Sequence, residues 1–269
     1  MHVRHAHAAI AILGILTLFS VGYWYIDQTH DGFRPLAPLP AKKVDPYAPR
    51  AVRVEESTEF ATITGTYPQF DAASVALNRE IQNVVRNAIE EHKNVSQVNW
   101  ESHVETALEQ TESTPPSDDR FPLSIRFEAP VSNERLVSVL LHISQYSGGA
   151  HGISSMYTFN YDMKSKRILT LADVFKNHPS YLKKLSEESR RQLTVTLSEN
   201  AGDGQVPDAD FLTSGTEPTE NNFSLFTFTP QADALTIYFG LYQVAAYAYG
   251  EPYIVVPLPT NDSVPTWLQ

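Results

Sequence analysis

Residues 135–152 read RLVSVLLHISQYSGGAHG, and this stretch decides the fold class. Apolar and polar residues alternate along it: Val137, Val139, Leu141 and Ile143 share one face, and Ser138, His142, Ser144 and Tyr146 mostly share the other. A period of two is typical of a half-buried β-strand. The Gly-rich end, residues 147–152, predicts a tight loop. A returning strand should follow, with Tyr157, Phe159 and Tyr161 on one face.

The region before this stretch predicts a strand and then a helix. Val52–Thr66 is rich in β-branched residues and predicts one strand that ends near Tyr67-Pro68. Helical spacing then begins, with Leu77, Ile81, Val84, Val85, Ala88, Ile89 and His92 on one stripe. Asp71 or Ser74 should cap this helix, which continues or restarts toward Leu108. The apolar stripe predicts a helix that packs on a sheet.

The other elements complete an α+β pattern. Phe121–Glu128 predicts a strand, followed by a turn around Pro130–Asn133. Thr170-x-x-Asp173 matches a capping box that opens a short helix. A second long helix should start with Pro179 in its first turn, carry Leu182, Leu185, Leu193 and Leu197, and end at Gly202-Asp203-Gly204. Phe223–Thr229 and Leu235–Phe239 predict a hairpin, and Tyr253–Leu258 predicts a last strand. We therefore expect a mostly antiparallel sheet with two long packed helices.

The N-terminus predicts a membrane anchor. Apolar residues run almost unbroken from Ala8 to Ile26, which at about 1.5 Å per residue matches a hydrocarbon core of about 30 Å. Arg4 precedes the run and Asp27 follows it, so the C-terminal part should lie outside the cell. The predicted divisions are a cytoplasmic end at 1–7, a transmembrane helix at 8–26, a Pro-rich tether at 27–50, an extracytoplasmic domain at 51–259 and a tail at 260–269.

A cleaved signal peptide is the alternative interpretation of the apolar run. Ser20-Val21-Gly22 is its best cleavage site, but bulky Tyr23, Trp24 and Tyr25 follow directly. The run also exceeds the roughly 7 to 15 residues of a signal core. We therefore favour a retained single-pass anchor in a bacterial cytoplasmic membrane.

Composition narrows the function classes. The chain holds 20 Lys plus Arg against 31 Asp plus Glu. Because Arg4 is the only charged residue before Asp27, the exported part carries 19 positive and 31 negative charges, a net of −12. Such a surface disfavours nucleic acid and attracts cationic partners. The 269 residues include no cysteine, which excludes disulfides, thiolate metal sites and a cysteine nucleophile.

Three collinear stretches carry a family resemblance. They are residues 145–152 with 157–162, residues 169–175, and Asn222-Phe223 with 235–239 and 242–250. In this order and spacing they resemble the extracellular domain of the RsiV-type anti-sigma factors, which is shared with the N-terminal module of PdaC-type peptidoglycan deacetylases. The resemblance covers roughly Val52–Leu258.

The resemblance implies an envelope-facing α+β domain that binds lysozyme in the anti-sigma proteins. We expect no sigma-binding segment, because few residues precede the apolar run. We also expect no deacetylase domain, because the chain stops soon after Leu258. What remains is a recognition module whose ligand is a lysozyme-like protein or a peptidoglycan fragment.

Two clusters supply the ligand-binding candidates, which are Tyr146, Gly148, Gly149, His151, Tyr242, Tyr247 and Tyr249. In the loop, the glycines permit positive φ and close approach of another surface. His151 could contact a ligand, form a metal or catalytic site with His142, or only bond local backbone. The tyrosines suit sugar stacking or a protein interface, and equally a core edge.

Other polar groups favour structural interpretations. Asp203, Asp208 and Asp210 lack the order of a calcium loop, and Glu55, Glu56 and Glu59 fit a polar strand face. We therefore expect no metal, no cofactor and no catalytic residue. The leading hypothesis is a non-catalytic, membrane-anchored binding module. The alternatives are an envelope glycan hydrolase using His142, His151 and a carboxylate, a deacetylase-accessory protein, and a structural partner in an envelope complex.

Overall fold

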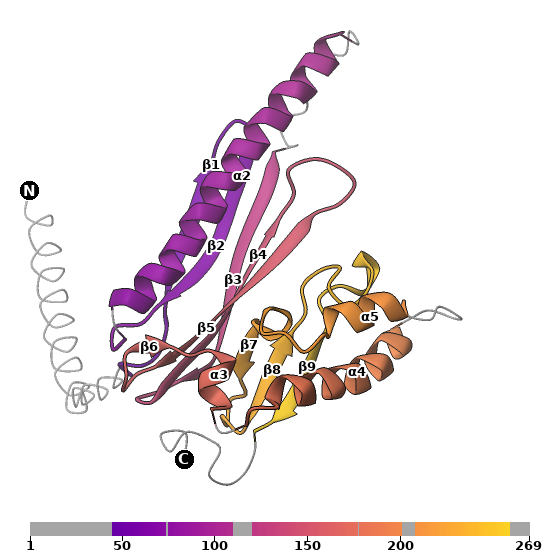
Figure 1. Ribbon diagram of the computed structural model, residues 1–269. Helices are drawn as coiled ribbons and strands as arrows, with labels where there is room; N and C mark the ends of the chain where they lie inside the picture. Colours follow the sequence, from indigo (N-terminus) through magenta and orange to yellow (C-terminus); the bar gives the residue numbers. More distant parts are fainter. Residues whose placement is uncertain (1–44, 74, 110–119, 177, 201–207, 259–269) are drawn as a thin grey trace, which may run out of the picture. The chain divides into compact units, whose positions relative to one another are not determined.

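The computed structural model describes residues 45–73, 75–109, 120–176, 178–200 and 208–258. They form a six-stranded sheet of order β1-β2-β3-β4-β5-β6 and a three-stranded sheet of order β7-β8-β9 (Figure 1). The strands are β1 (Arg50–Ser57), β2 (Ala61–Gln69), β3 (Phe121–Ser132), β4 (Leu136–Gln145), β5 (Ile153–Asp162), β6 (Arg167–Ile168), β7 (Phe226–Phe228), β8 (Ala234–Tyr238) and β9 (Tyr253–Pro257). The helices are α2 (Val75–Glu109), α3 (Leu171–Val174), α4 (Tyr181–Asn200) and α5 (Ala209–Gly215), with short 3-10 turns at Asn221–Phe223 and Tyr247–Tyr249.

The predicted α+β class is confirmed, but with two sheets in place of one. All strand pairs are antiparallel except β2 with β3. α2 connects that parallel pair, as a parallel connection requires a crossover. Gly65 makes the pairing possible, because it has φ +140° and a Cβ there would lie 2.0 Å from the Ile125 carbonyl oxygen.

The predicted single strand Val52–Thr66 is in fact a hairpin. Thr58 breaks it, because its Oγ1 accepts the N–H groups of Phe60 and Ala61 at 3.3 and 2.9 Å and closes a turn. The polar run at residues 55–59 interrupts the alternation, and the apolar positions change from even numbers (Val52, Val54) to odd ones (Ala61, Ile63), which is the sequence signal of the turn. β1 becomes an exposed edge strand that protects β2.

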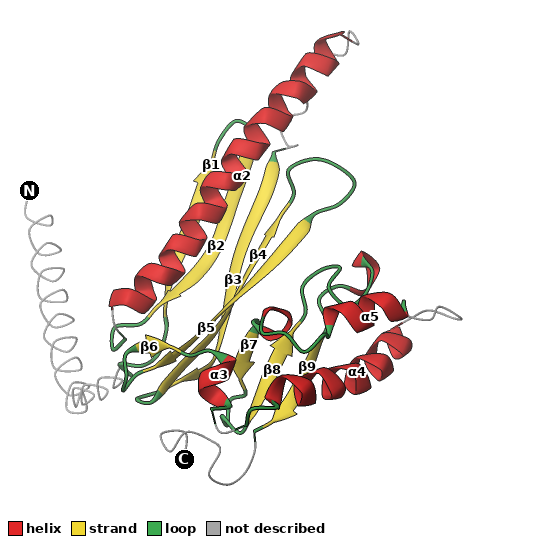
Figure 2. Ribbon diagram, viewed as in Figure 1, coloured by secondary structure: helices red, strands yellow, loops and turns green. Residues whose placement is uncertain are grey.

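The first hydrophobic core lies between α2 and the large sheet (Figure 2). Leu77, Ile81, Val85 and Ile89 are buried along the helix, as the stripe predicts. The helix is continuous to Glu109. Ser74, one of the two predicted caps, lies outside the described residues, and Asp71 forms an exposed ion pair with Arg50.

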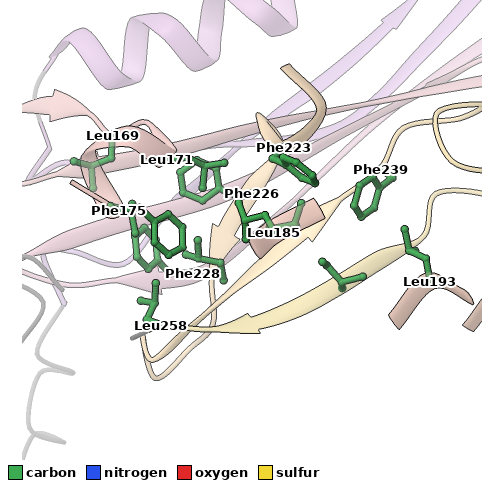
Figure 3. Packing of buried hydrophobic residues seen from close by; sticks show 14 of the residues in the cluster. Leu169, Leu171, Phe175, Leu185, Leu193, Phe223, Phe226, Phe228, Phe239 and Leu258 are labelled. Atoms are coloured by element: carbon green, nitrogen blue, oxygen red, sulfur yellow. The ribbon is translucent and has the colours of Figure 1, made fainter. Parts of the chain in front are cut away.

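The second core lies around the small sheet and is rich in phenylalanine (Figure 3). The predicted hairpin and last strand form this sheet, and Leu185, Leu193 and Leu197 of α4 are buried in its core. Gln192 also bonds the edge of β9, because its side chain donates to the Val255 carbonyl at 2.8 Å and accepts the Val255 N–H at 3.2 Å. The two long helices therefore pack on different sheets.

A buried polar network joins the two sheets. Ser138 of β4 donates to the Asn160 side-chain oxygen of β5 at 2.7 Å. Asn160 donates to the Phe226 carbonyl at 2.7 Å, and the Phe228 N–H donates to the Ser138 hydroxyl at 3.0 Å. These bonds satisfy backbone groups at the edge of β7, which would otherwise be unpaired. The network fixes the small sheet over β4 and β5.

Two boundaries differ from prediction. The turn expected at Pro130–Asn133 lies later, since β3 continues to Ser132 through a register shift between Glu128 and Val131. A bulge accommodates Pro130, which has no N–H to donate. Pro179 lies in the turn before α4, which begins at Tyr181. The capping box at Thr170 and Asp173 is confirmed.

The predicted anchor at residues 8–26, the tether to residue 44 and Gly202-Asp203-Gly204 lie outside the described residues. Among the helices that the structure describes, none combines the length and the apolar character needed to cross a membrane.

Candidate ligand-binding groove

The loop between β4 and β5 has the glycine geometry that its sequence predicts. Gly148 and Gly149 adopt φ of +97° and +104°, which side chains disfavour. The Tyr146 hydroxyl donates to the Gly149 carbonyl at 3.0 Å, and Asn99 of α2 donates to the Ser147 carbonyl. Contacts on both sides therefore fix the loop.

His151 lies against two tyrosines that follow it by more than 90 residues. Its ring stacks on Tyr247 with centroids 4.0 Å apart, and its Nε2 is 3.3 Å from the Tyr242 hydroxyl. Its Nδ1 is 2.9 Å from the Gly152 carbonyl, which can only accept. In the neutral ring Nδ1 therefore carries the proton, and the Tyr242 hydroxyl donates to Nε2. The Tyr247 hydroxyl donates to the same Gly152 carbonyl at 2.9 Å.

The tyrosine cluster divides into a surface part and a core part. Tyr242 is 48% exposed and has φ +63°, a left-handed conformation that is uncommon for an aromatic residue. Such strain costs of order 1–3 kcal/mol and often occurs at functional sites. Tyr249 instead packs against the core of the small sheet. The core-edge interpretation is therefore confirmed for Tyr249, whereas a binding role for the exposed Tyr242 stays a prediction.

A row of serines crosses the large sheet beside the loop. Ser124 of β3 pairs with Ser144 of β4, which pairs with Ser154 of β5. Directly paired residues point to the same face, so the three hydroxyls line up. Those of Ser124 and Ser154 have no hydrogen-bond partner among the described residues. Sequence reasoning missed this row, because the serines come from three strands and only the register aligns them.

Three adjoining hollows form what we call the groove. The first, about 330 Å³, is lined by Ser124, Ser144, Tyr146, Ser154 and Tyr247, among others. The second, about 500 Å³, includes His151, Ser154, Tyr157, Tyr242, Tyr247 and Glu251. The third, about 320 Å³, includes Arg126, Glu128, His142, Tyr238, Glu251 and Tyr253. Tyr247 and Ser154 line the first two, and Glu251 lines the last two.

Glu251 is the second feature that sequence reasoning missed. Its Oε2 lies 2.6 Å from His142 Nε2, and the two side chains are only 13% and 12% exposed. The Oε1 atom is buried without a hydrogen-bond partner among the described residues. The Ser144 hydroxyl lies 3.5 Å from the other ring nitrogen of His142. His142 is therefore paired with a carboxylate, whereas His151 pairs with tyrosines.

Three of the remaining acidic candidates have structural roles. Glu55 pairs with Arg53 at 2.7 Å and Glu56 with Lys93 at 2.5 Å. Asp208 caps α5 by accepting the Asp210 N–H at 2.8 Å. Asp203 lies outside the described residues, as its loop does. Within the part of the chain that the structure describes, no group of three or more His, Asp or Glu side chains could hold a metal ion.

Two pKa shifts concern groups near the groove. Burial lowers the pKa of His92, although its bonds to the Phe121 carbonyl and to Gln145 oppose this effect. Burial also raises the pKa of Tyr238, which lines the third hollow. Both groups are therefore neutral near pH 7.

Comparisons with known families match two segments of the chain. Residues 54–154 match the family described as Deacetylase PdaC, and residues 172–258 match the family described as Protein of unknown function (DUF3298). The chain carries a PdaC-type module with a DUF3298 segment. The loop of His151 lies in the first segment, and Tyr242, Tyr247 and Glu251 lie in the second. The groove is thus built from both.

A curated relative supports this assignment. Peptidoglycan-N-acetylmuramic acid deacetylase PdaC of Bacillus subtilis (strain 168) is 33% identical over 137 residues. These residues are 51% of this chain but 28% of the relative, so the chain spans less than a third of that protein. The predicted resemblance to the PdaC-type module is confirmed. The likeness to anti-sigma factors stays a prediction.

Two solved structures are similar in fold. A DUF3298-family member from Bacteroides fragilis NCTC 9343 superposes with a TM-score of 0.54 at 20% identity, over 80% of this chain and 92% of that one. A DUF3298-family protein from Pseudomonas aeruginosa PAO1 gives 0.49 at 20% identity, over 83% and 97%. The first likeness shows a shared fold and no more.

Proposed function

We propose that this chain is a non-catalytic binding module that holds a cell-wall glycan in the groove. The observation that carries the proposal is the pairing of a ring platform with two serine hydroxyls that have no partner among the described residues. His151, Tyr242 and Tyr247 form the platform, and Ser124 and Ser154 carry hydroxyls that have no partner among the described residues.

This chemistry suits a sugar. The C–H face of a pyranose stacks on rigid aromatic rings, which supply contact area at a small cost in conformational entropy. Hydroxyls on the groove floor can both donate to and accept from sugar hydroxyls. Three adjoining hollows offer more length than a single monosaccharide fills. A linear polymer therefore fits better than a small metabolite.

Two further observations favour the cell wall as the source of this glycan. The PdaC relative is named for its action on peptidoglycan. The apolar run Ala8–Ile26 would keep the domain at the outer face of the cytoplasmic membrane, where it meets the wall. On this view the module positions the chain on the glycan and leaves the chemistry to a partner enzyme.

The test is co-sedimentation of the full chain, held in detergent, with purified insoluble peptidoglycan. Tyr247→Ala should weaken binding about tenfold, because stacking is lost. Tyr247→Phe keeps the ring and should bind nearly as well as the parent. Tyr47→Ala changes a tyrosine that lines none of the three hollows and should have no effect. If a folded Tyr247→Ala protein bound peptidoglycan as well as the parent does, the groove would not be the binding site.

A lysozyme-like cationic protein is the second candidate ligand. The exported part carries a net charge of −12, which would speed encounter with such a partner. Pull-down of lysozyme at low and high salt distinguishes the two candidates. Binding to lysozyme but not to peptidoglycan would replace the first proposal with this one.

The contact between His142 and Glu251 favours one alternative, a glycan hydrolase. A carboxylate at 2.6 Å could orient the imidazole as a general base, with Ser144 at its other nitrogen. His151 would have no part in it, since it bonds tyrosines. Turnover of peptidoglycan fragments that is abolished in Glu251→Gln would establish this alternative, and its absence in the parent would dismiss it.

A further inference from the structure

The two ends of the groove differ in charge. No Asp, Glu, Lys or Arg side chain lines the first hollow among the described residues. The third hollow contains Arg126, Glu128 and the pair of His142 with Glu251. A ligand that fills the whole groove therefore passes from an uncharged site to a charged one.

Two charges in the third hollow are available to a ligand. Glu251 is already bonded to His142, so its charge is engaged. Arg126 and Glu128 are exposed, and neither makes an ion pair or a side-chain hydrogen bond with another described residue. They stand two positions apart on β3, and therefore on the same face of the sheet. Judged by the described residues, the hollow presents one unpaired cation and one unpaired anion.

Free charges of opposite sign suit a ligand that carries both. A guanidinium binds a carboxylate through two parallel N–H donors, and a nearby carboxylate attracts an ammonium group. Tyr238 and Tyr253, with ring centroids 6.2 Å apart, add apolar area beside these charges. A short peptide with free carboxylate and amine groups has this combination, whereas an unmodified neutral glycan does not.

We propose that the groove selects a glycan that carries a short peptide stem. The sugars occupy the first and second hollows, and the stem enters the third, where Arg126 binds a stem carboxylate and Glu128 faces a stem amine. This inference rests on the proposed glycan-binding function and names the ligand class within it.

The test compares two probes by calorimetry on the full chain in detergent. One is the peptide-free disaccharide of N-acetylglucosamine and N-acetylmuramic acid, with its lactyl carboxyl amidated. The other is the same disaccharide bearing a tetrapeptide stem. The stem should tighten binding about tenfold, as expected for one charge-assisted contact at an exposed site.

Arg126→Gln should remove that tenfold gain and leave the affinity for the peptide-free probe unchanged. Arg126→Lys keeps the positive charge but lacks the two parallel N–H donors of a guanidinium, so it should retain part of the gain in affinity. Arg135→Gln changes an exposed arginine in the β3–β4 turn, outside the hollow, and should bind both probes as the parent does.

Each outcome separates this inference from the proposed function. Equal affinity for both probes, or an equal loss for both in Arg126→Gln, overturns peptide recognition and leaves glycan binding intact. Absence of binding to either probe overturns the proposed function, and this inference with it.

Discussion

The two sheets of this domain are stabilised differently. The strands β1–β5 of the large sheet are 8 to 12 residues long, and α2 covers the sheet with a regular stripe of aliphatic residues. The small sheet has strands of three to five residues and a core rich in phenylalanine. Short strands provide few ladder hydrogen bonds, so the small sheet depends more on packing and on side chains that satisfy its edges. The groove therefore combines both parts of the domain. The large sheet supplies its floor, and the segment between β8 and β9 of the small sheet supplies Tyr242, Tyr247 and Glu251, which line it.

The largest expected effect comes from breaking the phenylalanine core. Phe228, the last residue of β7, is fully buried, and Phe228→Ala should lower the free energy of unfolding by about 3–5 kcal/mol. Urea denaturation followed by circular dichroism measures this change. The exposed Val195 of α4 serves as the control, because Val195→Ala should stay within about 0.5 kcal/mol. A Phe228→Ala loss below about 1 kcal/mol would show that the small sheet is not held by packing.

The next effect concerns the joint between the sheets. Asn160→Ala leaves the Phe226 carbonyl without its side-chain donor and the Ser138 hydroxyl without its acceptor, and should cost about 1–3 kcal/mol. A double-mutant cycle with Ser138→Ala should give a coupling of about 0.5–3 kcal/mol, because the residues share one network. If the two losses simply add, the network does not act as a unit. Glycan binding should also fall, since the tyrosines would shift relative to the floor.

The smallest effect depends on pH and concerns the link from β6 to α3. The Arg167 guanidinium, with the N–H and hydroxyl of Thr170, lowers the pKa of Asp173 from 3.8 to about 2. A lowered carboxyl pKa stabilises the fold above pH 3.8, and this stability is lost as the pH falls toward 2. Because the pair is partly solvated, we expect about 1–2 kcal/mol. Urea unfolding at several pH values should give a flatter acid profile for Asp173→Asn. If the acid profile of Asp173→Asn were as steep as the parent's, other groups would account for the loss of stability at low pH.

Local patterns predicted most of the elements. Alternation in β4 and β5, the helical stripe of α2 and the capping box at Thr170 each depend on neighbours within a few residues. The division into two sheets could not be predicted, because a long-range pairing leaves no periodic signal. The break at Thr58 does have a signal, since the polar run at residues 55–59 interrupts the alternation. Pro130 predicts a turn because proline has no N–H to donate to a ladder, but a β-bulge accommodates it equally well.

The candidate site was predicted in part. Loop chemistry predicts Gly148, Gly149 and His151 as candidates, and the structure brings His151 against Tyr242 and Tyr247. Tyr249 was grouped with those tyrosines by proximity in sequence, yet it packs on a core. The serine row and Glu251 could not be found, because their meaning depends on strand register and on a contact spanning 109 residues.

The ring stack between His151 and Tyr247 bridges two chain segments that match separate families. Chimaeras that exchange one segment between relatives could keep both hydrophobic cores and still lack the proposed recognition surface. Selection for binding would then act on the combination, so the two segments should be inherited together and should diverge in step.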